Sequence, residues 1–100
     1  MMKHIVFWTL KSESGGLTAQ QNALEIKARL EALNGRIPGL LNLEVGIDSS
    51  RTDASADLAM SCEFADRAAL DAYRVHPEHL VVADFIGAAR LTRTLVDYEV

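Results

Sequence analysis

Residues 3–11, KHIVFWTLK, form an alternating segment in which neither face of a β-strand would be polar. Side chains alternate across a strand, so one face carries His4, Val6, Trp8 and Leu10 while the other carries Ile5, Phe7 and Thr9. Apolar side chains on both faces have to be covered from both sides. The sequence therefore predicts a sheet that lies between two layers.

A helix is predicted to follow the first strand over 19–34. Thr18 and Gln21 have the spacing of a capping box. Apolar residues then recur every three or four positions, at Ala23, Ile26, Leu30, Leu33 and Ile37. Asn34 and Gly35 are typical of a helix C-terminus, so we expect the helix to stop there.

Two antiparallel strands are predicted next, after a turn at Pro38 and Gly39. In the segment 40–47 the apolar face is expected to carry Leu41, Leu43, Val45 and Ile47. In the segment 57–64 it is expected to carry Leu58, Met60, Cys62 and Phe64. The polar run DSSRTDASA between them indicates a hairpin connection.

The last third of the chain predicts two helices and a closing strand. Asp66 is a suitable cap for a helix that ends near Val75, with a buried stripe of Ala69, Ala72, Tyr73 and His76. Pro77 favours a new helix that runs to about residue 89. In the final strand, 91–100, one face is expected to carry Thr92, Thr94, Val96 and Tyr98, and the other Leu91 and Leu95.

This order, β-α-β-β-α-β with the second helical segment split at Pro77, predicts a ferredoxin-like α+β fold. One domain, 1–100, would hold a four-stranded antiparallel sheet with helices on one face. The other face would then expose apolar side chains of the first strand. A second copy packed sheet against sheet covers such a face most economically, so we expect a homodimer.

Composition narrows the possible partners and the location. The net charge of −4 and the scattered basic residues argue against nucleic acid or an anionic membrane as a partner. The apolar stretch near the N-terminus is too short and too aromatic for a signal peptide, which favours a cytoplasmic location. Cys62 is the single cysteine, and its apolar neighbours predict a buried strand residue.

The segment YRVHPEH, 73–79, contains most of the residue types that could carry chemistry. Pro77 disfavours the α conformation at His76, so one helix ends there and another begins, with His79 in its first turn. One reading is structural: Tyr73 packs with its hydroxyl at the surface, His76 caps the helix and His79 satisfies backbone groups. The other reading is a functional pocket. Metal binding is not expected, because no ligand motif accompanies the histidines.

Four segments together carry a family resemblance. KHIVFWTLK, PGLLNLEVG, DLAMSCEF leading to ALDAYRVHPEHL, and VDYE resemble the stress-responsive dimeric α/β-barrel (Dabb) domain proteins over nearly the whole chain. The resemblance implies a homodimer whose two sheets make a barrel. It also implies a pocket between the sheet and the helices of each protomer.

A smaller group within that family resembles olivetolic acid cyclase, a polyketide cyclase that closes a poly-β-keto chain without cofactor or metal. The resemblance places the catalytic histidine of that group at His79, its tyrosine at Tyr73 and a further pocket histidine at His4. Trp8 and Met60 depart from the group's pattern. We expect these two bulky side chains to line the substrate-binding pocket and to reduce its volume.

Aldol chemistry requires a base next to a carbonyl and a hydrogen-bond donor for the resulting oxyanion. The positive end of a helix dipole would keep His79 neutral as the base, and Tyr73 would donate. Asp97, Glu44 or a backbone carbonyl could orient the rings. The sequence leaves three functions open: a cofactor-free cyclase, lyase or isomerase acting on a small keto compound, a non-catalytic binder of a small apolar ligand, and a stress-associated homodimer. A monooxygenase of a related dimeric barrel ranks lower.

Overall fold

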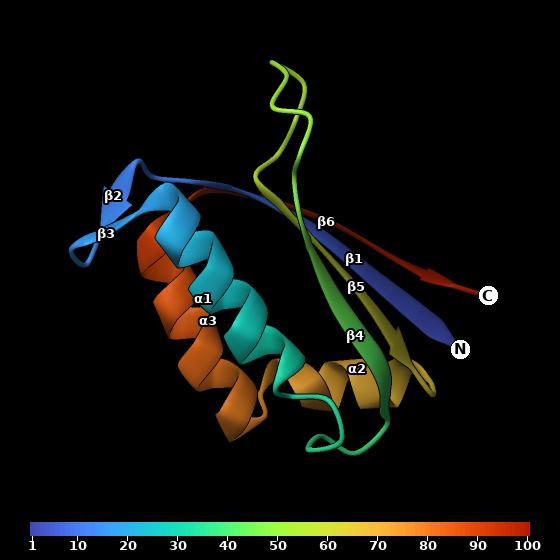
Figure 1. The fold of residues 1–100 in the computed structure, drawn as a ribbon. Helices are drawn as coiled ribbons and strands as arrows, with labels where there is room; N and C mark the ends of the chain where they lie inside the picture. Colours follow the sequence, from blue (N-terminus) through green and yellow to red (C-terminus); the bar gives the residue numbers. More distant parts are fainter.

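A four-stranded antiparallel sheet with all its helices on one face forms the framework of the molecule (Figure 1). The computed structural model describes all residues, 1–100. The strands lie in the order β4-β5-β1-β6 and comprise β1 (Met2–Leu10), β4 (Leu40–Ile47), β5 (Leu58–Phe64) and β6 (Arg90–Glu99). The predicted ferredoxin-like α+β fold is confirmed. The first and last strands pair along their whole length, which brings residues from both ends of the chain together.

The three helices, α1 (Ala19–Glu31), α2 (Arg67–Arg74) and α3 (Pro77–Ala89), begin where the sequence predicts. Thr18 and Gln21 form the expected capping box, and the Asp66 carboxylate accepts from the backbone N–H of Ala69 at 2.8 Å. None of the three combines the length and the apolar character that crossing a bilayer requires.

Helix α1 ends three residues earlier than predicted. The Asn34 side chain does not extend the helix but bonds the backbone of Leu43 in the adjacent strand, donating to its carbonyl at 2.8 Å and accepting from its N–H at 2.9 Å. These bonds fix the turn against the start of β4. Gly35, with a φ of +79°, lies in the left-handed region that follows.

A small hairpin connects β1 to α1. Strands β2 (Glu13–Ser14) and β3 (Leu17–Thr18) pair across Gly15 and Gly16, both of which have positive φ. Two consecutive positive φ angles at glycine suit a tight hairpin turn. The Asn22 side chain, buried in α1, donates to the Ser14 carbonyl at 3.2 Å and so attaches the hairpin to the helix.

The hydrophobic core lies between the inner face of the sheet and the helices. The inner face of β1 carries His4, Val6, Trp8 and Leu10, which are all at most 6% exposed; the sequence had left open which of the two faces would lie inside. The α1 stripe is confirmed, and so are the buried positions of Cys62 and Phe64 in β5. His4 and Asn22 are the only polar residues that are buried.

Two β-bulges change the predicted strand faces. Leu40 pairs with Phe64 while Asn42 pairs with Glu63, so Leu41 is the extra residue and is 59% exposed rather than buried with Leu43. A second irregularity pairs Thr9 with Thr92 but Leu10 with Arg90, and leaves Leu91 as an extra residue that is 62% exposed. Alternation read from sequence cannot detect an inserted residue.

The buried face of α2 also differs from the predicted stripe. Leu70 and Tyr73 are fully buried, whereas Ala72 is exposed. The helix has only eight residues, so a three-residue spacing and a four-residue spacing both fit its short pattern. The bulky side chains decide between them, because burying Leu70 removes more apolar surface from water than burying Ala72.

The outer face of the sheet is bare, as predicted. Phe7, Val96 and Tyr98 are 43%, 54% and 43% exposed there, and Figure 1 shows no helix on that side. Ile5 pairs with Val96 across the β1–β6 ladder. The chain by itself supplies one of the two layers that the first strand requires.

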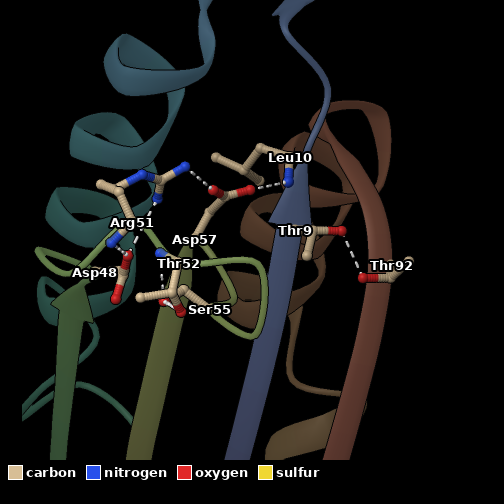
Figure 2. A network of polar contacts seen from close by, with 8 residues as sticks. All are labelled: Thr9, Leu10, Asp48, Arg51, Thr52, Ser55, Asp57 and Thr92. Atoms are coloured by element: carbon tan, nitrogen blue, oxygen red, sulfur yellow. Dashed lines mark hydrogen bonds and ion pairs between the residues drawn. The ribbon is translucent and has the colours of Figure 1, made fainter.

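The connection between β4 and β5 extends beyond the sheet (Figure 1) and is held by its own polar groups (Figure 2). Arg51, with a φ of +51°, pairs with Asp48 and with Asp57, the latter at 2.8 Å. The other Asp57 oxygen accepts from the backbone N–H of Leu10 at 2.7 Å. These bonds tie the predicted hairpin connection to the end of β1.

Candidate functional site

A cavity of about 200 Å³ lies between the inner face of the sheet and the helices. The strands contribute His4, Trp8, Met60, Arg90 and Arg93 to its lining. The helices contribute Tyr73, His79 and the apolar side chains of Leu30, Ala83 and Ile86. The structure thus brings together all five residues that the sequence analysis selected.

Tyr73 and His79 meet at the junction of α2 and α3. Their ring centroids are 4.1 Å apart, with the planes inclined by 39°. The junction is fixed by His76, whose Nδ1 accepts from the backbone N–H of Glu78 at 3.1 Å, and by Pro77 at the first helical position. The predicted cap at His76 is confirmed. The helix break therefore places the two rings on the same wall of the cavity.

The tautomer of His79 follows from one hydrogen bond. Its Nδ1 lies 3.2 Å from the Arg74 carbonyl oxygen, which can only accept, so Nδ1 carries the proton. In the neutral ring Nε2 is then an unprotonated acceptor, and it makes no hydrogen bond within the chain. Burial, the largest cause, lowers the pKa of His79 below its usual value and favours this neutral form. The sequence analysis had expected the helix dipole to be the cause.

Tyr73 is a buried donor without an acceptor. The residue is 1% exposed, and its hydroxyl oxygen is buried and has no hydrogen-bond partner. The alternative expectation, a hydroxyl at the surface, is wrong, because packing against Phe64, at 5.0 Å between centroids, holds the ring inside. Burial raises the pKa of the Tyr73 phenol, which keeps it protonated.

His4 is oriented by Asp97, its partner across the β1–β6 ladder. The Asp97 carboxylate accepts from Nδ1 of His4 through one oxygen and from the Arg74 guanidinium through the other. This arrangement leaves Nε2 of His4 as the unprotonated nitrogen when the ring is neutral. Burial lowers the pKa of His4, and the Asp97 contact opposes that effect. Glu44, another orienting group considered from the sequence, lies on the outer face.

Trp8 and Met60 form the apolar walls, and both are almost fully buried. The indole N–H of Trp8, like the Tyr73 hydroxyl, is buried with no hydrogen-bond acceptor. Unsatisfied buried donors are uncommon and call for an explanation. At about 30 Å³ per water, a cavity of this volume corresponds to about seven waters, so it suits a small molecule and not a long polyketide chain.

Three other predicted features lie outside this chemistry. Burial raises the pKa of the Cys62 thiol to about 12, so this cysteine is a core residue and not a nucleophile. His76 does not line the cavity. No group of three or more His, Cys, Asp or Glu side chains converges in the way that metal ligands do.

Sequence reasoning missed Arg90 and Arg93 as cavity residues. Both lie on β6, on either side of Leu91, the residue inserted at the bulge. Their spacing of three would place them on opposite faces of a regular strand. No simple alternation could therefore have assigned both to the cavity.

A second cavity, of about 480 Å³, lies beside the β4–β5 connection and is lined in part by Gln20, Ile47 and Leu10. Its charged groups are Arg51, Asp48 and Asp57, which pair with one another (Figure 2). This larger cavity contains no histidine or tyrosine. The smaller cavity is the better candidate, because it holds unpartnered donors and a free basic nitrogen.

The family profile of the stress responsive A/B barrel domain, Dabb, matches residues 2–100. The chain belongs to the Dabb family. A Dabb family protein of ferredoxin-like fold from Mesorhizobium loti is 30% identical, with 98% of this chain and 94% of that chain covered and a TM-score of 0.71. A dimeric ferredoxin-like protein from Bacteroides fragilis is 25% identical, with 99% and 95% covered and a TM-score of 0.84.

A third solved structure, hydroxynitrile lyase from Passiflora edulis, is 22% identical to this Dabb domain. The comparison covers 97% of this chain and 90% of that chain, with a TM-score of 0.81. At that identity the similarity shows a shared fold. Comparison with proteins of curated function finds no sequence match.

Proposed function

We propose that this Dabb domain is a cofactor-free proton-transfer enzyme of the cyclase or lyase type that acts on a small keto compound. The observation that carries the proposal is the pair of rings at the α2–α3 junction, Tyr73 and His79, whose centroids are 4.1 Å apart on the wall of one cavity. One ring offers an unpartnered O–H, and the other offers a free Nε2. These are the donor and the base that enolate chemistry requires.

In the proposed step, Nε2 of His79 removes a proton from the carbon next to the substrate carbonyl. The C–H electron pair becomes a C=C bond, and the carbonyl π pair moves onto the oxygen, which accepts a hydrogen bond from Tyr73. In the aldol direction, the enolate carbon attacks a second carbonyl carbon of the same molecule, and that oxygen takes the proton back from the imidazolium. The base is regenerated and no redox partner is needed.

The hydrogen bonds around the two rings support these roles. The bond from Nδ1 of His79 to the Arg74 carbonyl directs Nε2 away from the backbone, and this bond persists when the ring is protonated. Burial of the cavity strengthens a hydrogen bond to a developing oxyanion, because the local dielectric constant is low. His4, held by Asp97, offers a second unprotonated nitrogen, and the centroid of its ring lies 6.3 Å from that of Tyr73.

The comparisons are compatible with this class of chemistry. One protein of the same fold is a hydroxynitrile lyase and another is an antibiotic biosynthesis monooxygenase. Both are 22% identical to this chain, so they support the fold and not the reaction. We favour the lyase or cyclase class over oxygenation, because the cavity lining contains a matched base and donor.

The first half-reaction can be tested without knowing the natural substrate. The wild-type protein should accelerate deuterium incorporation from D₂O at the carbon next to the carbonyl of butanone or methyl acetoacetate, measured by NMR above the buffer rate. His79→Ala should reduce that acceleration about 100-fold or more, and Tyr73→Phe about tenfold or more. His76→Asn is the matched control, because it removes an imidazole outside the cavity and keeps a good N-cap residue.

Equal exchange rates for the wild type and His79→Ala would refute the proposed base. If ligands raise the melting temperature of the wild type but no exchange is seen, the cavity binds without turnover, and the non-catalytic alternative replaces the enzyme. Thermal unfolding of each variant shows whether a lost rate reflects lost structure.

We further infer that the functional unit is a homodimer. We also infer that it is located in the cytoplasm, as the N-terminal sequence predicts. The dimer is supported by the exposed Phe7, Val96 and Tyr98 on the outer face and by the dimeric state of the Bacteroides fragilis and Thermobifida fusca proteins of the same fold. A sedimenting species of twice the 11.0 kDa chain mass at micromolar concentration would agree with it. A monomer would contradict it.

A further inference from the structure

The cavity is lined by two arginines that form no ion pair within the chain. Of the seven arginines, five form ion pairs with carboxylates: Arg29, Arg36, Arg51, Arg67 and Arg74. The remaining two, Arg90 and Arg93, make no ion pair and no side-chain hydrogen bond, and both line the cavity beside Tyr73 and His79.

The bulge in β6 is what brings both arginines to the same cavity. Arg93 pairs with Trp8 across the ladder, and Arg90 pairs with Leu10, so both partners belong to the inner face of β1. Leu91 is the extra residue of the bulge, and its insertion brings Arg90 back to the same face of the sheet as Arg93. Without it, residues three apart would point to opposite sides of the sheet, and the cavity would have one arginine.

No carboxylate of the protein is available to the two arginines. The cavity lining contains neither aspartate nor glutamate. Asp97, whose charge acts on Arg93, already accepts hydrogen bonds from His4 and from Arg74. Burial and the neighbouring charges of Arg90 and Arg74 lower the pKa of Arg93, and the charge of Asp97 opposes that effect.

Two uncharged donors of the lining also lack an acceptor. The Trp8 indole N–H and the Tyr73 O–H are buried donors with no partner, and both residues are at most 4% exposed. The lining therefore presents an excess of donors. A ligand that satisfies them has to be rich in acceptor oxygens.

We propose that Arg90 and Arg93 bind a carboxylate on the substrate, so that the substrate class is a small oxo acid with its carbonyl oxygen at Tyr73. The planar fork of a guanidinium matches a carboxylate in two parallel hydrogen bonds. The volume of about 200 Å³ suits an acid of few carbon atoms. This inference rests on the proposed function, since it adds the carboxylate to the carbonyl chemistry at Tyr73 and His79.

Trp8, the only tryptophan, provides a direct probe of binding, because its indole N–H gives a single resonance in a ¹⁵N-labelled sample. Titration with acetoacetate and with its neutral methyl ester, at constant ionic strength, gives two dissociation constants for each variant. We expect the wild type to bind the acid at least tenfold more tightly than the ester. Arg93→Gln and Arg90→Gln should each remove most of that preference.

Arg67→Gln is the matched control, because Arg67 pairs with Asp71 on α2 and does not line the cavity. It should keep the full preference for the acid. Equal affinities of acid and ester for the wild type, or an unchanged preference in the Arg90→Gln/Arg93→Gln double variant, would overturn the inference. Arginine-dependent binding of inorganic phosphate that is tighter than that of acetoacetate would overturn the choice of carboxylate.

The binding titration and the deuterium-exchange assay together distinguish failure of the carboxylate site from failure of the proposed enzyme. Arginine-dependent acid binding without deuterium exchange would sustain the carboxylate site and refute the enzyme. Exchange at equal rates on acid and ester would sustain the enzyme and refute the carboxylate site. His79→Ala should lose exchange but retain the preference for the acid, because it leaves both arginines in place.

Discussion

The Asp97 carboxylate accepts a hydrogen bond from Nδ1 of His4, its direct partner across the ladder between the last and the first strand. The Asp97 side chain is only 10% exposed, and its second oxygen is occupied by the Arg74 guanidinium. This one carboxylate thus fixes the tautomer of a cavity histidine and neutralises a cation at the end of α2. Both of its oxygens accept hydrogen bonds, one from His4 and the other from Arg74.

Asp97→Asn should destabilise the fold and disturb the cavity. The amide keeps the shape of the side chain but has one acceptor oxygen in place of two, so either His4 or Arg74 loses its partner. We expect a loss of about 1–3 kcal/mol in the free energy of unfolding, measured by urea denaturation. Asp71→Asn, which breaks only the exposed pair with Arg67, should change that free energy by far less. Similar losses in both variants would contradict a special role for Asp97.

The two cavity histidines should make stability fall as the pH falls. Burial lowers the pKa values of His4 and His79 in the folded state below the ordinary histidine value of about 6.5, so the unfolded chain binds protons first as the pH falls. The free energy of unfolding should therefore rise with pH up to about 6.5 and then level off with respect to these groups. Urea denaturation from pH 5 to 7.5 measures the slope, which His79→Asn should reduce. An unchanged slope in that variant would contradict the lowered pKa.

Filling the cavity should abolish ligand binding while the fold persists. Ala83 faces the cavity from α3, so Ala83→Leu places three further carbon atoms in a space of about 200 Å³. We expect acetoacetate affinity, followed at the Trp8 indole resonance, to fall at least tenfold. Ala88→Leu on the same helix is the control, because Ala88 is exposed and does not line the cavity. Retained affinity in Ala83→Leu would place the binding site elsewhere.

Gly39→Ala should be among the most destabilising single-methyl additions in the chain. Gly39 has a φ of +80°, and an added Cβ would lie 2.5 Å from the Cβ of Ala69 at the start of α2. Backbone strain and the clash together should cost about 2 kcal/mol or more in thermal or urea unfolding. Gly87→Ala, an exposed helical position with open space, should instead gain about 0.5–1 kcal/mol. An unchanged free energy of unfolding in Gly39→Ala would show that the turn can shift to make room for the methyl group.

Val96→Glu should dissociate the inferred dimer. Val96 is 54% exposed and pairs with Ile5 on the outer face of the sheet. A carboxylate buried between two apolar sheets would lose its hydration without a partner. Sedimentation should show a monomer, whereas Val81→Glu, on the exposed side of α3 at 67%, should remain dimeric. A dimeric Val96→Glu would mean that another surface joins the protomers.

The fold was predictable because its signals are strong and local. The alternation of β1, the capping box at Thr18 and Gln21, and the helix break at Pro77 each depend on a few neighbouring residues. The errors occurred where the pattern depends on register. Leu41 and Leu91 are bulge residues. An extra residue changes which face of the sheet the positions beyond it occupy, and the amino-acid pattern does not reveal it.

The candidate site was predictable in its rings and not in its charges. Tyr73, His79 and His4 were selected from residue type and family resemblance, and all three line one cavity. Arg90 and Arg93 were missed, since their common orientation depends on the Leu91 bulge. Asp97 was one of several groups that could orient a ring. Choosing it required the pairing register of the first and last strands, in which His4 and Asp97 are 93 residues apart in sequence.

The pairing of β1 with β6 has a consequence for synthesis of the chain. His4 leaves the ribosome 93 residues before Asp97, its partner across the ladder. Contacts of such large sequence separation close late, because the entropy of the intervening chain has to be lost first. The helices and the β4–β5 hairpin can form on the nascent chain, but the cavity cannot. Ligand binding would therefore report only chains in which β6 has been synthesised, and a product that stops before β6 would not bind.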